Sequence, residues 1–224
     1  MKVRFVVLLM ALALAVGFSV PASAGTIVLT FEGLQNNEPI LNYYNAGLGG
    51  FGSGPGPAWG IIFGADSLAL IDADDGGDGN FANEPSPKTT AYFLTGPGVV
   101  MNVPAGFDTG FSFFYASVTY SGSVDVWDGL DATGTLLASI PLTPNGSNCG
   151  GDPSGTFNCW TAIGAAFAGT AMSVNFSGVA NQIGFDNITV GSETPGGAVP
   201  EPGSMLLLGT GLVGLGRAWR KRRG

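Results

Sequence analysis

The sequence predicts an all-β fold, an antiparallel β-sandwich. Short runs rich in β-branched and aromatic residues recur through the middle of the chain, and Gly, Asn, Asp and Pro separate them. Between the two ends of the chain there is no apolar period of about 3.6 residues, which would be typical of an amphipathic helix. Glycine supplies 38 of the 224 residues, more than twice its usual share of about 7%, and this favours many tight turns.

The chain begins with a segment typical of a secretory signal peptide. Lys2 and Arg4 precede an apolar run over residues 5–20, which we expect to be helical. Ala22 and Ala24 then occupy the small-residue positions that signal peptidase accepts. The sequence therefore predicts a signal peptide over residues 1–24, cleavage after Ala24, and export.

The runs with strand character fill residues 25–191, which we interpret as one sandwich domain. They lie at residues 26–31, 59–63, 67–71, 89–95, 98–103, 110–120, 123–127, 135–141, 156–163, 171–176 and 182–190. Residues 110–120 carry apolar side chains on both faces, so we expect this strand in the interior of a sheet.

The last of these runs breaks its own alternation. Ile183 and Phe185 share one face of a regular strand, whereas Ile188 and Val190 share the other. A β-bulge between the two pairs would place both of them in the core. The same bulge is expected to turn Asp186 outward, toward an ion.

The densest group of acidic side chains follows residues 67–71. It consists of Asp72, Asp74, Asp75 and Asp78, with glycines between them. Ca²⁺ takes six to eight oxygen ligands, and a glycine-rich acidic loop lets the backbone wrap around the ion. Position twelve counted from Asp72 is not Glu, which argues against an EF-hand. A calcium site and a solvated acidic turn both remain open.

The two cysteines and a tryptophan provide further candidates. Cys149 and Cys159 enclose a short loop, and export to an oxidising compartment predicts a disulfide between them. Trp127 is either part of ordinary hairpin-turn chemistry or an aromatic platform for a sugar ring, with acidic residues on both sides. Other candidates for such a platform are Trp59, Tyr43, Tyr44 and Trp160.

Composition and charge exclude several classes of function. Histidine is absent, so the commonest general base is missing, and we expect no enzyme activity. Residues 25–199 hold fifteen acids and a single base, Lys88, a formal charge of about −14. Such a surface repels phosphate groups, which excludes nucleic acid as a partner, and it attracts divalent cations.

The C-terminus has three parts in order, after an expected linker over residues 192–198. The triplet Pro200, Glu201 and Pro202 breaks the chain, and an apolar stretch follows over residues 203–216. Fourteen helical residues reach about 21 Å, so we expect a short transmembrane helix. The basic cluster that closes the chain is expected to stay cytoplasmic. Its members are Arg217, Arg220, Lys221, Arg222 and Arg223.

Residues 199–224 resemble the PEP-CTERM sorting signal of Gram-negative bacteria that make exopolysaccharide. The same tail is also catalogued as a C-terminal motif of ice-binding proteins. The resemblance implies that a membrane protease, the exosortase, cuts near the Pro-Glu-Pro triplet. It implies a precursor anchored in the inner membrane and a product at the cell surface or in the extracellular matrix.

The two ends of the domain, residues 31–34 and 185–188, resemble the first and last strands of galactose-binding-like jelly rolls. The resemblance implies a jelly-roll-like sandwich and a structural Ca²⁺ shared by Glu32 and Asp186. No sugar-contacting residues carry over.

These observations predict a non-enzymatic, exported protein of the cell surface or of an exopolysaccharide matrix such as a biofilm. We expect its sandwich to be stabilised by Ca²⁺ and to bind extracellular polysaccharide. Two alternatives remain: an extracellular polysaccharide hydrolase, which would act through a pair of carboxylates, and an ice-binding or adhesive structural protein.

Overall fold

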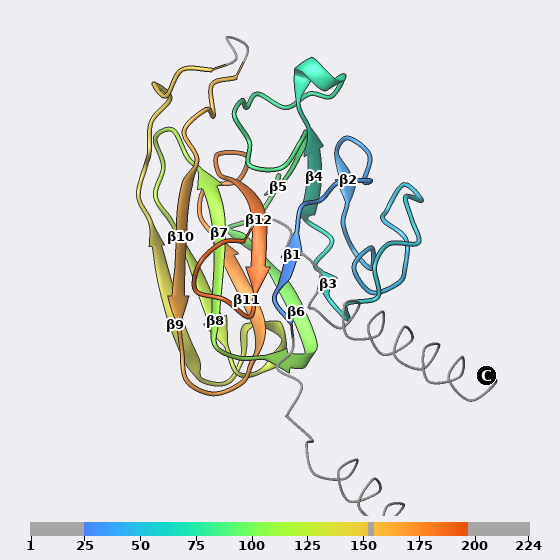
Figure 1. Ribbon diagram of the computed structural model, residues 1–224, viewed down its shortest axis with the longest axis vertical. Helices are drawn as coiled ribbons and strands as arrows, with labels where there is room; N and C mark the ends of the chain where they lie inside the picture. Colours follow the sequence, from blue (N-terminus) through green and yellow to red (C-terminus); the bar gives the residue numbers. More distant parts are fainter. Residues whose placement is uncertain (1–24, 152–154, 197–224) are drawn as a thin grey trace, which may run out of the picture.

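The computed structural model describes residues 25–151 and 155–196, which form two antiparallel sheets packed face to face (Figure 1). One sheet has seven strands: β1 (Ile27–Leu29), β2 (Glu38–Pro39), β4 (Ser67–Ile71), β5 (Thr89–Phe93), β7 (Gly110–Ala116), β10 (Thr161–Ala166) and β12 (Gly184–Val190). The other has five: β3 (Ile62–Phe63), β6 (Gly98–Phe107), β8 (Gly122–Trp127), β9 (Leu136–Leu142) and β11 (Ala171–Ser177). Two short 3₁₀ turns, η1 (Ala73–Asp75) and η2 (Leu130–Ala132), complete the elements.

The strand order confirms the predicted all-β class and the jelly-roll-like sandwich. The larger sheet runs β10-β7-β12-β5-β4-β2, with β1 added beside β12, and the smaller runs β3-β6-β11-β8-β9. Every strand pair is antiparallel. Strand β7 lies between β10 and β12, as its two apolar faces predicted. Strand β2 was not predicted, because two residues are too few to show an alternation.

The core between the sheets is built around aromatic rings. Phe113 of β7 meets Phe176 of β11 and Phe185 of β12 at ring-centroid distances of 6.2 and 5.7 Å, in edge-to-face geometry. Phe176 and Phe185 approach to 4.9 Å across the two sheets. Such contacts add about 0.5–1.5 kcal/mol each to the gain from burying apolar area.

The bulge predicted in the last strand is present, but its consequence for Asp186 is the opposite of the expected one. The register of β12 against β7 shifts between Asp186 and Thr189. Both apolar pairs, Ile183 with Phe185 and Ile188 with Val190, are buried. Asn187, which lies within the bulge, has a left-handed backbone conformation with a φ of 45°. The expectation that Asp186 points outward is wrong: its side chain is fully buried.

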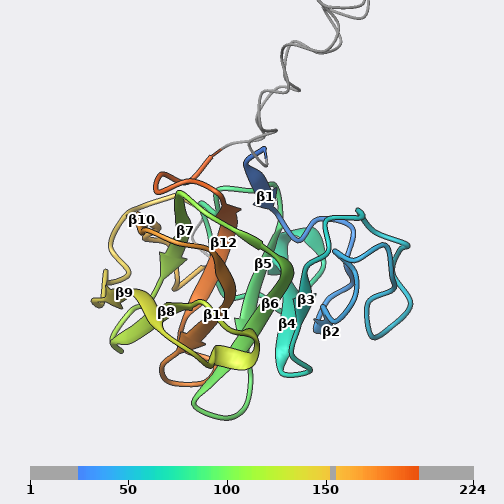
Figure 2. The same cartoon turned by 90° about the horizontal axis from the view of Figure 1, so that it is seen from below.

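The first and last strands bring the two ends of the domain together. Ile27 of β1 pairs with Val190 of β12, so the chain enters and leaves at the same end of the sandwich (Figure 2). The predicted signal peptide and the predicted transmembrane helix lie outside the described residues. Within the part of the chain that is described, no helix is long and apolar enough to cross a membrane.

Residues 192–196, expected as a linker, lie along the sheet instead. The hydroxyl of Ser112 donates to the Ser192 carbonyl at 2.9 Å, and the Gly196 amide donates to the Thr189 hydroxyl at 3.1 Å. A Cβ on Gly164 would collide with the backbone carbonyl oxygen of Glu193, so this glycine makes room for the segment. Residues 192–196 therefore pack as part of the sandwich.

Candidate functional site

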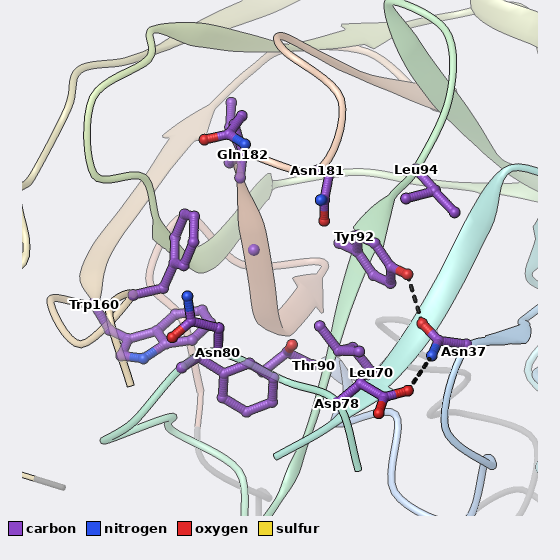
Figure 3. A pocket seen from close by; sticks show the side chains of 14 residues that line it. Asn37, Leu70, Asp78, Asn80, Thr90, Tyr92, Leu94, Trp160, Asn181 and Gln182 are labelled. Carbon is purple, nitrogen blue, oxygen red and sulfur yellow. Dashed lines mark hydrogen bonds between the residues drawn. The ribbon is translucent and has the colours of Figure 1, made fainter. Parts of the chain in front are cut away.

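A pocket of about 480 Å³ lies over strands β4, β5 and β12 of the seven-stranded sheet, and Figure 3 shows the side chains that line it. Ala91 and Phe93 of β5 point into the core. Because side chains alternate along a strand, Thr90 and Tyr92 point to the opposite face and line the pocket. The other residues that line it are Asn37, Leu70, Asp78, Asn80, Phe81, Leu94, Phe157, Trp160, Asn181, Gln182, Ile183 and Gly184.

Two loops joined to each other form one wall of this pocket. Phe81 and Phe157 form an isolated parallel bridge, and the Phe157 amide donates to the Asn80 carbonyl at 3.0 Å. The Asn83 side-chain amide donates to the Gly150 carbonyl at 2.7 Å, which ties the first loop to the loop enclosed by Cys149 and Cys159. The wall therefore combines residues about seventy positions apart in sequence.

The predicted disulfide is confirmed and belongs to this wall. Cys149 and Cys159 are bonded, with their Cα atoms 5.3 Å apart. Trp160 follows directly, so the crosslink fixes the backbone next to the pocket's largest aromatic side chain.

Trp160 lines the pocket with an indole ring whose N–H is already used within the protein. Its indole N–H already donates to the Ala82 carbonyl at 3.0 Å. The ring packs edge-to-face on Phe81, with centroids 6.3 Å apart, and it lies against Gly184 of β12. An aromatic face held in this way suits stacking against the C–H face of a sugar ring.

A polar network occupies the opposite side of the pocket. The side-chain amides of Asn36 and Asn37 both donate to Asp78 Oδ2, at 2.7 and 3.0 Å. The Tyr92 hydroxyl donates to Asn37 Oδ1 at 2.6 Å. Burial raises the pKa of Tyr92 and the charge of Asp78 adds to this, so the phenol stays a donor at neutral pH.

The structure divides the predicted acidic group. Oxygens of Asp72, Asp75 and Glu84 lie within 4.8 Å of one another, and Asp72 is buried among them. Burial raises the pKa of Glu84, and the charges of Asp72 and Asp75 add to the effect. Asp74 lies outside this trio, and Asp78 belongs to the pocket. Glu84 was missed because it follows the acidic run at a distance in sequence.

Glu32 and Asp186 bind the same neighbouring segment, and each has protein donors of its own. Glu32 Oε1 accepts the amide hydrogens of Lys88 and Thr89 at 3.0 and 2.9 Å. Asp186 accepts the amide and the hydroxyl of Ser86 at 2.7 and 2.8 Å. No third acidic ligand from the described residues joins them. Burial raises the pKa of Asp186 to about 7, although the hydrogen bonds from Ser86 act in the opposite direction and lower it.

The candidate aromatic platforms occupy different places. Trp127 is half-buried at the end of β8, in the five-stranded sheet, and does not line the pocket. Tyr44 is buried in the core, and Trp59 stacks on it with ring centroids 5.5 Å apart. Trp160 is the member of this set that lines the pocket.

Most residues of the pocket were not predicted from the sequence. Asn37, Tyr92 and Gln182 are scattered through the chain and carry no motif. The available signal was indirect: Trp160 follows a half-cystine, and Asp78 closes the acidic run.

Comparison with known proteins identifies the tail. Residues 198–223 match the PEP-CTERM protein-sorting motif, which confirms the interpretation of the Pro-Glu-Pro triplet, the apolar stretch and the basic cluster. No curated protein matches the chain. The chain is thus a β-sandwich protein with a C-terminal sorting motif.

Among solved structures, similarity is low. A family 43 arabinoxylan arabinofuranohydrolase from Bacillus subtilis, solved with cellotetraose, is 18% identical, with a TM-score of 0.36 over 57% of this chain and 24% of that chain. A carbohydrate-binding module of a Cellvibrio mixtus lichenase, solved with cellotriose, is 16% identical, with a TM-score of 0.31 over 57% of this chain and 87% of that chain.

An adhesin domain of Lys-gingipain from Porphyromonas gingivalis is 16% identical, with a TM-score of 0.32 over 58% of this chain and 92% of that chain. The chain spans about a quarter of the length of the arabinofuranohydrolase. These similarities assign neither a ligand nor an activity to the present protein.

Proposed function

We propose that this protein is an exported, exosortase-sorted protein of the cell surface or extracellular matrix whose sandwich binds polysaccharide without cleaving it. The observation that carries the proposal is the pocket, which is lined on one side by the aromatic ring of Trp160 and on the other by the hydrogen-bonded network of Asn37, Tyr92 and Asp78 (Figure 3). Aromatic faces pack on sugar rings, and amide and carboxylate groups bind sugar hydroxyls.

The carboxylates of the pocket favour binding over hydrolysis. Among the described residues that line it, Asp78 is the sole acid. Glycoside hydrolysis commonly uses two carboxyl groups about 5–9.5 Å apart. Asp78 is also the acceptor of two asparagine side-chain amides, so part of its carboxylate is already engaged in hydrogen bonds within the protein.

The position of the pocket suits a protein attached through its C-terminus. Gly184, at the beginning of β12, lines the pocket, whereas Val190, at the end of the same strand, adjoins the exit of the tail. Six residues of strand separate them by about 20 Å. A domain held by its sorting tail would therefore present the pocket away from the attachment point.

The sorting motif supports the rest of the proposal. We infer that signal peptidase removes residues 1–24, that the C-terminal helix holds the precursor in the inner membrane, and that an exosortase of a Gram-negative cell cuts near Pro200. We further propose that Asp72, Asp75 and Glu84 hold a structural Ca²⁺, because three carboxylate oxygens this close repel one another without a cation.

A glycan array tests the proposal. The full chain, in mild detergent, is applied to polysaccharides that include those of the producing organism, and the bound glycans are then assayed for new reducing ends. We expect binding without turnover. Silence on every glycan would contradict the binding function, and turnover would assign the protein to the hydrolases instead.

A further inference from the structure

The carboxylate of Asp78 is fixed in the pocket and retains one acceptor oxygen for a ligand. Asn36 and Asn37 both donate to its Oδ2 atom, and its own amide donates to Asn36 Oδ1 at 3.4 Å. Asn37 is held in turn by the Tyr92 hydroxyl, as the dashed lines in Figure 3 show. Asp78 Oδ1 has no hydrogen bond from the described residues. A ligand that fills the pocket therefore meets a rigid, negatively charged acceptor.

Among the described residues that line the pocket, none carries a positive charge to balance Asp78. The lining contains neither Lys nor Arg, and Lys88, which lies outside the lining, is the one basic residue among those described. The loop that carries Asp78 also carries Asp72, Asp74 and Asp75. An anionic group on a ligand would thus be repelled by Asp78 and would find no ion-pair partner in the described surroundings.

The other polar groups of the lining suit hydroxyls. Asn80 Oδ1 accepts the Thr156 amide at 2.9 Å, which leaves the Asn80 side-chain N–H₂ as a donor. The side-chain amides of Asn181 and Gln182 make no hydrogen bond with the described residues, and each offers a donor and an acceptor. A hydroxyl can donate to Asp78 and accept from an amide, whereas a carboxylate or a sulfate ester can only accept.

We infer that the pocket is selective for an uncharged glycan and that Asp78 is the residue that excludes glycans bearing carboxylate or sulfate groups. The inference rests on the proposed glycan-binding function and narrows it to one chemical class. Asp78 does this by accepting hydroxyl hydrogens from a neutral sugar and repelling an anionic one.

The test compares two groups of oligosaccharide probes on the full chain. The neutral group contains hexamers of glucose, xylose and mannose, and the anionic group contains oligogalacturonate and a sulfated galactan oligomer. Affinity is measured by isothermal titration calorimetry at 20 and 200 mM NaCl. We expect at least one neutral probe to bind and every anionic probe to bind at least tenfold more weakly, with a smaller difference at the higher salt concentration.

Asp78→Asn removes the charge but keeps the size of the side chain. We expect the ratio of anionic to neutral affinity to rise at least tenfold in this variant. Asp66→Asn is the matched control, because Asp66 is an exposed acid outside the pocket that accepts the Thr95 hydroxyl. It should leave the ratio unchanged.

The outcomes separate the two proposals. Equal or tighter binding of an anionic probe by the wild type overturns the selectivity inference and leaves glycan binding intact. An unchanged ratio in Asp78→Asn, with a thermal midpoint like that of the wild type, overturns the role of Asp78. If no probe of either group binds, and the array is also silent, the glycan-binding function itself is contradicted.

Discussion

The indole ring of Trp160 lies against the backbone of Gly184, where a Cβ atom would come within 3.2 Å of the ring. The absence of a side chain at residue 184 thus leaves room for the ring in its present position. Glycine at this position belongs to the binding site, although it offers no side chain to a ligand. A side chain here would push the ring toward the space that we assign to the glycan.

Gly184→Val is therefore expected to weaken glycan binding about tenfold while the fold persists. Valine is compatible with a strand, and its methyl groups displace the Trp160 ring. The measurement is a double-mutant cycle by calorimetry, with circular dichroism as the check on folding. In a Trp160→Ala background, Gly184→Val should cost little further affinity. Additive losses would show that the two residues act independently.

Loss of the disulfide is expected to destabilise the protein and loosen the pocket. A ten-residue separation between Cys149 and Cys159 corresponds to a stabilisation of about 3 kcal/mol from the restricted unfolded chain. A Cys149→Ser, Cys159→Ser double variant should show this loss in urea denaturation, together with weaker glycan binding. Dithiothreitol should reproduce both effects in the wild type and have none in the variant.

Stability is expected to fall as pH rises from 4 to 8, because of Asp186. Its pKa is raised from 3.8 to about 7 by burial, so the folded state holds this proton more tightly than the unfolded state does. The resulting stabilisation, at most about 4 kcal/mol, is fully present below pH 4 and is lost as the pH rises through 7.

Denaturation of the wild type and of Asp186→Asn, measured across this pH range, isolates the contribution. The variant cannot titrate at this position, so its stability should depend less steeply on pH, even though it starts lower after losing an acceptor for Ser86 or Asn187. Parallel pH profiles for the two proteins would refute the assignment.

Calcium is expected to raise the melting temperature through Asp72, Asp75 and Glu84. A ligand present at a hundred times its dissociation constant stabilises by about 2.7 kcal/mol. Differential scanning fluorimetry with calcium and with a chelator should show the shift in the wild type and no shift in Glu84→Gln. Asp74→Asn is the matched control and should keep the shift, because Asp74 lies outside the trio. A shift that survives Glu84→Gln would place the ion elsewhere.

The strands were predictable because alternation is a local signal. Residues 67–71 were predicted as a strand and form β4 over the same bounds, and the slipped alternation near Phe185 located a real bulge. The direction of Asp186 was not predictable. A bulge can turn a side chain either way, and the burial of this one depends on Ser86, a hundred residues earlier.

The pocket could not be predicted from the sequence for a different reason. Its aromatic wall requires Phe81 to pair with Phe157, and its polar wall requires Asn37 to meet Tyr92 and Asp78. These pairs of residues are neither neighbours in sequence nor related by a regular spacing. Each contact therefore depends on how the strands are arranged in the folded sheet. The sorting motif, in contrast, could be recognised from the sequence, because it consists of consecutive residues and does not depend on contacts in the fold.

Glycan affinity of the Trp160→Ala variant tests the central claim most directly, with Phe51→Ala as control because Phe51 is an aromatic residue 59% exposed outside the pocket. For the glycan that the wild type binds best in calorimetry, the account predicts at least a tenfold loss with Trp160→Ala and no change with Phe51→Ala. Unaltered affinity in a folded Trp160→Ala protein would contradict it.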